Sequence, residues 1–114
     1  MKKTPSLLGN VLYLSLKKKP FDMIAKGIKK EEYREIKPHW DVRLLKKEGG
    51  FKDFDFVCFR NGYGKDAPEV WTGCDGIVFK KPIPEWCAGE PFDADKLYYA
   101  IKLGKVLAFP VNLC

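Results

Sequence analysis

Alternation of apolar and polar residues marks the first regular segment of the chain. In Val11–Leu16 a leucine falls at every second position, which places the leucines on one face of an extended chain and predicts a strand. The period then lengthens to the i, i+3, i+7 spacing of a helix at three apolar positions, Phe21, Ile24 and Ile28. We therefore expect a helix of about two turns over Pro20–Lys26, with a proline in its first turn and Gly27 at its C-terminal end.

A second strand and a second helix are expected after that glycine. Glu31–Lys37 alternates in character, which predicts a strand that Pro38 stops. Pro38–Lys47 has helical spacing, and Gly49-Gly50 is expected to end this helix. The residues expected to face the core are Trp40, Leu44 and either Val42 or Leu45.

The second half of the chain has short apolar runs separated by turn residues, which predicts strands and no helix. Gly73 suggests a bulge between two strand pieces, Gly104-Lys105 a tight turn, and Lys81–Pro91, with three prolines, a loop. The expected strands are Phe54–Arg60, which the turn Asn61-Gly62 closes, Val70–Thr72, Gly76–Phe79, Leu97–Leu103 and Val106–Phe109.

These elements define an α+β fold that is mostly β. Five or six mainly antiparallel strands with two short helices in the N-terminal half indicate a small β-barrel decorated by helices. The 114 residues suffice for one core and are too few for two, so we expect a single domain over residues 1–114.

Charge is distributed unevenly along this chain. Residues 1–47 contain 13 Lys and Arg against 5 Asp and Glu, a net charge of +8, whereas residues 48–114 contain 8 against 10, a net charge of −2. Together they give the overall +6. A basic half favours a polyanionic partner. The alternative is that the lysines only keep a small surface soluble.

Export, membrane insertion and metal binding are not expected. The apolar stretch 7–16 runs into three lysines rather than a small-residue cleavage site, and no run approaches the roughly 18 apolar residues of a spanning helix. We therefore expect a cytoplasmic protein with no membrane partner. Cysteines in that compartment are expected to be free thiols. No cysteine lies two to four residues from another or near the single histidine, His39, so neither a metal nor a cofactor is expected. The four cysteines are Cys58, Cys74, Cys87 and Cys114.

Polar residues are densest between Lys26 and Arg34, where the first helix ends and the second strand begins. On that strand Glu32 and Arg34 point to one face, and Lys29 in the preceding turn is the natural partner of Glu32. If the face lies inward, the three charges form a buried cluster beside a groove, where ligands bind. The alternative is a solvated edge strand with ordinary surface ion pairs.

The segment Gly27-x-Lys29-x-x-Glu32-x-Arg34 resembles the G-x-K-x-x-E-x-R signature of ASCH domains, the family named after activating signal cointegrator-1 homology. A strand and a short helix precede the signature as in that family, and the segment 99–104 is similar to its closing strand and turn. The resemblance covers about residues 12–106. It implies a PUA-like β-barrel, a cleft lined by the signature residues, and a role with RNA or modified nucleosides.

One branch of the ASCH family consists of small amidohydrolases that deacetylate N4-acetylcytidine. The resemblance implies a role for the signature lysine, which is Lys29 here, in that chemistry. This branch has a threonine where the present chain has Glu32, and it uses a further acidic residue downstream.

Two functions of different classes remain open. The first is an RNA- or nucleotide-binding module, in which cations hold phosphates and an unpaired base stacks on an aromatic ring. The second is a small hydrolase acting on a modified nucleoside or RNA, in which Glu32 activates water while Lys29 or Arg34 stabilises the oxyanion. Two cations beside a carboxylate make it a weaker base, which favours binding. The cations proposed for binding are Lys17, Lys18, Lys19, Lys29, Lys30 and Arg34, and the candidate rings are Tyr33, Trp71 and, if it does not face the core, Trp40.

Overall fold

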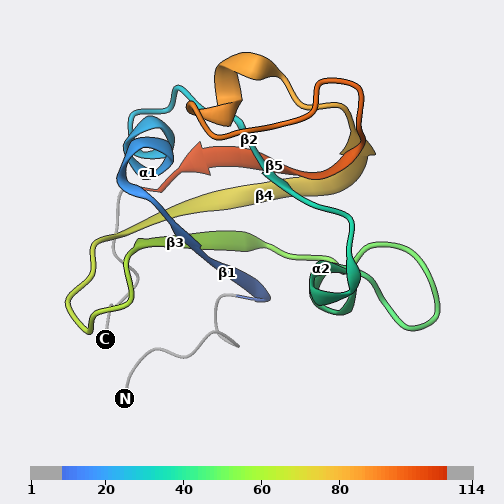
Figure 1. The fold of residues 1–114 in the computed structure, drawn as a ribbon. Coiled ribbons are helices and arrows are strands. Elements are labelled where there is room, and N and C mark those ends of the chain that lie inside the picture. Colours follow the sequence, from blue (N-terminus) through green and yellow to red (C-terminus); the bar gives the residue numbers. More distant parts are fainter. Residues whose placement is uncertain (1–8, 108–114) are drawn as a thin grey trace.

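The computed structural model describes residues 9–107, which form one curled five-stranded sheet with two α-helices in the first half of the chain (Figure 1). The pair β1·β3 is parallel and the other three pairs are antiparallel. The predicted class, a small and mostly β α+β fold that is barrel-like, is confirmed. Its sheet is a half-barrel with β1 and β2 at the edges. In spatial order the strands are β1 (Val11–Leu16), β3 (Phe56–Asn61), β4 (Glu69–Lys80), β5 (Tyr98–Val106) and β2 (Glu31–Arg34).

One hydrophobic core joins the sheet to both helices. Strand β1 shows how the sequence builds it, because Leu12 and Leu14 are buried while Tyr13 between them is exposed. The core comprises Leu12, Leu14, Phe21, Ile24, Leu44, Val57, Phe59, Val70, Ile77, Tyr99, Ile101 and Leu103. Removal of these side chains from water is the main force that fixes the curl of the sheet against the helices.

Helix α1 (Lys18–Ala25) ends in a Schellman motif. Gly27 has a φ of +75°, and its N–H donates to the Ile24 carbonyl at 2.9 Å, while the Ile28 N–H donates to the Met23 carbonyl at 2.9 Å. The predicted glycine stop is therefore confirmed, although the helix begins two residues earlier than expected. Ile28 lies beyond the stop and is exposed, so its place in the helical spacing was a wrong prediction.

Helix α2 (Pro38–Leu44) is three residues shorter than predicted. Leu45 has an extended backbone and forms an isolated bridge with Phe51, and this non-local pairing ends the helix before Gly49-Gly50 can do so. Leu44 is buried and Leu45 packs against the core, whereas Val42 is 74% exposed. Strand β2 is also shorter than predicted, since its pairing with β5 ends at Arg34.

The C-terminal strands differ from the prediction in continuity. β4 is one strand with register irregularities on both sides of Cys74, so the bulge at Gly73 is confirmed but the division into two strands is wrong. The turn at Gly104-Lys105 is also wrong, because β5 continues to Val106. A Cβ on Gly73 would lie 3.9 Å from the Cα of Gly104, so these glycines allow two strands to approach closely. The rest of the predicted return strand, residues 108–109, lies outside the described residues.

The loop predicted over Lys81–Pro91 contains a short 3-10 helix, η2 (Pro84–Cys87). It packs against β2, and in Figure 1 the loop that carries it crosses above β2 and β5. This loop covers the end of the sheet at which the signature segment lies.

Candidate functional site

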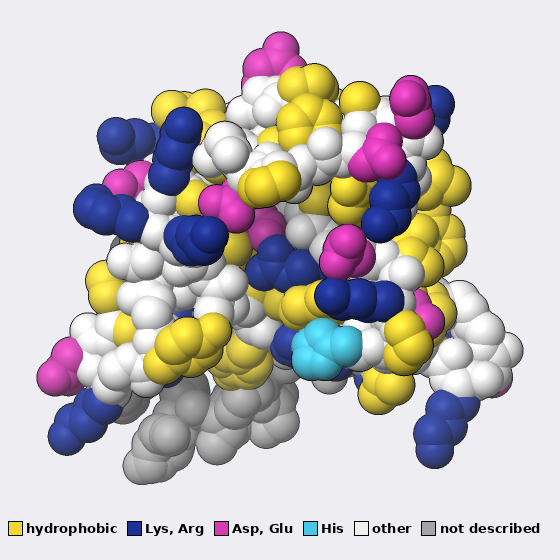
Figure 2. All heavy atoms as spheres, in the orientation of Figure 1, with side chains coloured by type: hydrophobic (Ala, Val, Ile, Leu, Met, Phe, Trp, Pro, Cys, Tyr) yellow, Lys and Arg dark blue, Asp and Glu magenta, His cyan; other side chains and the backbone are white. Residues whose placement is uncertain are grey.

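A pocket of about 450 Å³ lies where the two edge strands of the half-barrel approach each other. The end of β1 and the start of α1 form one wall, the signature segment in β2 forms the floor, and the loop around η2 forms the opposite wall. Figure 2 shows a central hollow on this face, with Lys or Arg and Asp or Glu side chains visible inside it. The volume is typical of a site for a small molecule.

The floor of the pocket carries a cluster of three charges, which we call the charged corner: Lys29, Glu32 and Arg34. Lys29 Nζ lies 3.3 Å from Glu32 Oε1, and Arg34 Nη1 contacts Glu32 Oε2. The side chains of Lys29 and Glu32 are 3% and 7% exposed, and that of Arg34 is 17% exposed. The expected partnership of these residues is confirmed, and the cluster is buried rather than solvated.

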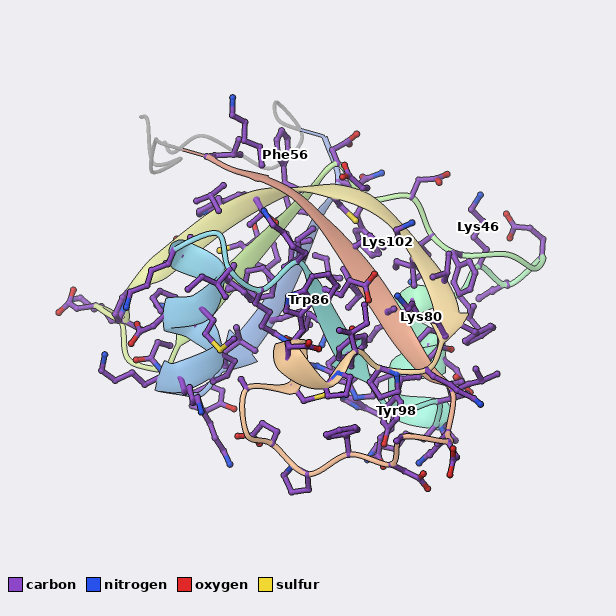
Figure 3. All side chains as sticks on the ribbon, turned by 90° about the horizontal axis from the view of Figure 1, so that it is seen from above. Lys46, Phe56, Lys80, Trp86, Tyr98 and Lys102 are labelled. Carbon is purple, nitrogen blue, oxygen red and sulfur yellow. The ribbon has the colours of Figure 1, made fainter. Side chains whose placement is uncertain are left out.

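Lys29 also fixes the loop that covers the pocket. Its Nζ donates a hydrogen bond to the backbone carbonyl of Trp86 in η2. The Schellman turn at Gly27 directs the chain so that Lys29 points inward while its neighbours Ile28 and Lys30 are exposed. In Figure 3 the turn carrying Trp86 lies over β2, and the loop then curves round to Tyr98 at the start of β5.

Arg34 is held by a stack on α2. Its guanidinium carbon lies 5.1 Å from the centre of the Trp40 ring, and that of Arg43 lies 4.9 Å from the same ring. Each arginine also donates to a backbone carbonyl of β1: Arg34 to Ser15 at 3.3 Å and Arg43 to Tyr13 at 2.7 Å. These side chains therefore connect the two edges of the sheet, where no strand pairing exists between β1 and β2.

Tyr33 also lines the pocket, and its hydroxyl belongs to a second network that includes Glu31. Its hydroxyl donates to Glu31 at 2.7 Å and accepts from the Ile83 N–H at 3.0 Å, while Lys80 forms an ion pair with Glu31 at 3.0 Å. Burial, with the adjacent carboxylate, raises the pKa of Tyr33 well above its usual range. The network attaches the start of the loop to β2, so the pocket is anchored from two sides.

Among the described residues that line the pocket, Cys87 is the one with a thiol. Its side chain is buried, and Sγ lies 3.7 Å from the Ile83 carbonyl. Burial raises the pKa of the thiol, and the nearby ammonium of Lys29, which acts in the opposite direction, does not reverse the effect. The group is thus a protonated thiol rather than an activated nucleophile. Cys58 and Cys74 are likewise free, and Cys114 lies outside the described residues.

The lining of the pocket is balanced in charge, although the basic first half of the chain led us to expect a basic cleft. It contains three cations and three carboxylates: Lys17, Lys29, Arg34, Glu32, Glu35 and Glu90. At the mouth Lys17 pairs with Glu90 at 3.5 Å, and Glu35 pairs with Lys37 at 3.0 Å. The basic surface lies beside the pocket, over α1, where Figure 2 shows a group of Lys and Arg side chains.

The sequence-proposed residues fall into three groups in space. Lys17, Lys29, Glu32, Tyr33, Arg34 and Trp40 line the pocket. Lys18 and Lys19 lie on the outer side of α1, where Lys18 pairs with Asp22 at 2.7 Å, and Lys30 is exposed next to the signature turn. Trp71 is outside both groups: it is buried beside Cys58, and its indole donates to Glu69.

Sequence reasoning missed the half of the pocket that comes from the second half of the chain. All of the proposed site residues except Trp71 came from residues 1–47, yet the second half of the chain contributes Pro82, Cys87, Glu90, Pro91, Phe92 and Tyr98. Its three prolines correctly indicated irregular structure, but no spacing in residues 81–98 reveals that the loop folds over the signature. The contacts of Lys29 with the Trp86 carbonyl and of Tyr33 with the Ile83 N–H show this.

Comparison with known proteins gave no match: no family model, no curated protein and no solved structure is significantly similar to the chain. No helix within residues 9–107 is long and apolar enough to cross a membrane. The same residues contain no group of three or more His, Cys, Asp and Glu side chains placed to hold a metal ion.

Proposed function

We propose that the protein binds an unpaired nucleotide, either within single-stranded RNA or free, in the pocket between β1 and β2. The observation that carries this proposal is the combination of flat apolar walls with buried cations in one pocket of about 450 Å³. Phosphate and base are the two groups that such a combination recognises, through charge and through stacking.

The walls of the pocket suit a flat aromatic ligand. Phe92 at the mouth is 39% exposed, and the Tyr33 and Tyr98 rings also line the cavity together with Pro82 and Pro91. Stacking of a base on an aromatic side chain contributes about 1–3 kcal/mol and tolerates any base. A duplex cannot present its bases to such a pocket, so the proposed ligand is single-stranded.

The outer side of α1 and the turn that follows it support binding of a continuing RNA strand. Lys19, Lys26 and Lys30 are exposed, and none of them forms an ion pair with another residue in the range 9–107. Neutralisation of about three phosphates by these lysines gives a slope of about −2 in log K against log salt. That slope corresponds to a loss of about 20-fold in affinity between 50 and 200 mM salt.

The ASCH resemblance supports the same proposal. The four signature positions lie together in this structure: Gly27 turns the chain, and Lys29, Glu32 and Arg34 form the charged corner. A hydrolase acting on a modified nucleoside or RNA is the second candidate, because Lys29 and Glu32 meet inside the pocket. It has weaker support, since each oxygen of Glu32 already contacts a cation and the Cys87 thiol is protonated.

Fluorescence anisotropy with a labelled twelve-nucleotide oligouridine tests the proposal. We expect binding at 50 mM salt, competition by single nucleotides, and no comparable binding of duplex RNA. Phe92→Ala should weaken binding about 10-fold, whereas Tyr63→Ala should not change it. Tyr63 is the matched control because it is an exposed ring outside the pocket. Absence of binding to any of these ligands at low salt would refute the proposal, and turnover of acylated nucleosides that Lys29→Ala and Glu32→Gln abolish would favour the hydrolase.

A further inference from the structure

The charged corner has an unbalanced positive charge. It contains two cations, Lys29 and Arg34, and one carboxylate, Glu32. The other charged residues of the pocket lining are at the mouth and already paired, Lys17 with Glu90 and Glu35 with Lys37 and Lys96. Because an unpaired charge away from water is costly, a net charge of +1 on the pocket floor favours a ligand group that carries one negative charge.

The hydrogen-bond donors of the corner are also incompletely used. Lys29 has three N–H donors, of which one bonds to the Trp86 carbonyl and one faces Glu32. Arg34 has five, and three of them contact Glu32 and the carbonyls of Tyr33 and Ser15. Within the described part of the chain, one donor of Lys29 and two of Arg34 therefore have no acceptor. A ligand group with several acceptor oxygens would satisfy them.

We propose that the charged corner binds one phosphodiester group of the nucleotide whose base occupies the pocket. This inference rests on the proposed function and specifies its ligand. A phosphodiester carries one negative charge and two free oxygens, which match the excess charge and the unused donors. A terminal phosphate carries about −1.5 to −2 at neutral pH and would leave the corner with an excess negative charge. The corner therefore favours an internal position in an RNA strand over a free nucleotide.

Isothermal titration with three matched ligands tests this inference: uridine, uridine 5′-monophosphate and the methyl ester of uridine 5′-monophosphate. The three ligands share the same base and sugar and differ in charge: uridine is neutral, the monophosphate is a near-dianion, and its methyl ester is a monoanion. We expect the ester to bind at least about 10-fold more tightly than uridine, and more tightly than the free monophosphate. Benzoate, a flat carboxylate, serves as a fourth ligand that separates a phosphodiester from any singly charged oxyanion.

Two variants change the net charge of the corner in opposite directions, and each should change a different ratio of affinities. Arg34→Gln makes the corner neutral and should reduce the preference for the ester over uridine to about onefold. Glu32→Gln raises the corner to +2 and should reverse the order of the ester and the free monophosphate. Lys102→Gln removes a positive charge from an exposed position on β5 outside the pocket lining and should leave all ratios unchanged. If Glu32→Gln does not fold, Arg34→Gln alone decides.

Each contrary outcome has a separate meaning. Equal binding of uridine and its ester overturns the phosphodiester inference and leaves the proposed function standing. Binding of benzoate as tight as that of the ester also overturns it, because the corner would then accept any singly charged oxyanion. If none of the three uridine ligands binds, the proposed function fails and this inference fails with it.

Discussion

Replacement of Lys29 by methionine should loosen the loop over the pocket before it unfolds the sheet. The side chains have similar length, but methionine removes the hydrogen bond to the Trp86 carbonyl and one of the two cations beside Glu32. Arg34 continues to neutralise Glu32, so the variant does not leave an isolated buried charge. We therefore expect a smaller loss than the roughly 3–5 kcal/mol of a fully broken buried ion pair.

The expected loss of stability is about 2–3 kcal/mol, the typical contribution of a hydrogen bond from a charged donor. In urea unfolding, with an m-value of about 1.5 kcal/mol/M, the midpoint should fall by about 1.3–2 M. Lys30→Met is the matched control, since Lys30 is adjacent, exposed and without an ion pair among residues 9–107, and it should change stability by less than about 0.5 kcal/mol.

Hydrogen exchange locates the effect. In Lys29→Met the amides of residues 83–93 should exchange faster than those of the central strands β3 and β4, because the loop has lost one of its attachments while the core is intact. Two results would refute this reasoning. One is a stability equal to that of Lys30→Met. The other is uniform acceleration across the sheet, which would mean that Lys29 supports the core rather than the loop.

Three other predictions concern the backbone of Gly27 and the hydrogen bond and pKa of Tyr99. Gly27→Ala should lower the melting temperature by about 4 °C, since a φ of +75° costs an alanine about 1 kcal/mol, and an unchanged temperature would contradict the Schellman geometry. Tyr99→Phe removes a 2.5 Å hydrogen bond to Asp41 that joins β5 to α2 and should cost about 2 kcal/mol in urea unfolding. Burial and that carboxylate raise the pKa of Tyr99 to about 12 from 10, so the folded state holds a proton that the unfolded state has lost. Stability should therefore fall between pH 10 and 12, and a wild-type unfolding midpoint that stays constant across this range would refute the assignment.

The fold was predictable where local sequence decides the structure. Strand β1 matched its predicted bounds because its leucines alternate and one face is buried, and Gly27 stopped α1 because only glycine adopts its φ readily. Predictions failed where a distant segment decides: Leu45 leaves its helix to pair with Phe51, and Gly104 continues a strand because β4 approaches it closely. Helical period and turn composition contain no information about such partners.

In the candidate site, too, the contacts set by local sequence were predictable and those made by distant segments were not. The partnership of Lys29 and Glu32 followed from a spacing of three residues across a turn, and that of Glu32 and Arg34 from a spacing of two on a strand. The walls did not follow from any pattern, since Phe92 lies on a loop with no regular period and nothing in the predicted strand that contains Tyr98 pointed to the pocket. Trp71 shows the converse error: an aromatic residue in a strand was proposed for stacking, but the fold buries it beside Cys58.

The charged corner and the apolar walls of the pocket are built by different segments of the chain. The charged corner is built by a stretch of eight residues, from Gly27 to Arg34, and its geometry depends on one glycine turn and one strand edge. The apolar walls depend on the loop of residues 82–92, which is held in place by Lys29 of the charged corner and also by Tyr33. We therefore expect substitutions in the loop to change the shape of the pocket walls while the charge of the corner stays the same. For the proposed nucleotide ligand, we therefore expect the short signature to determine the chemical class that binds and the loop to determine which member of that class is preferred.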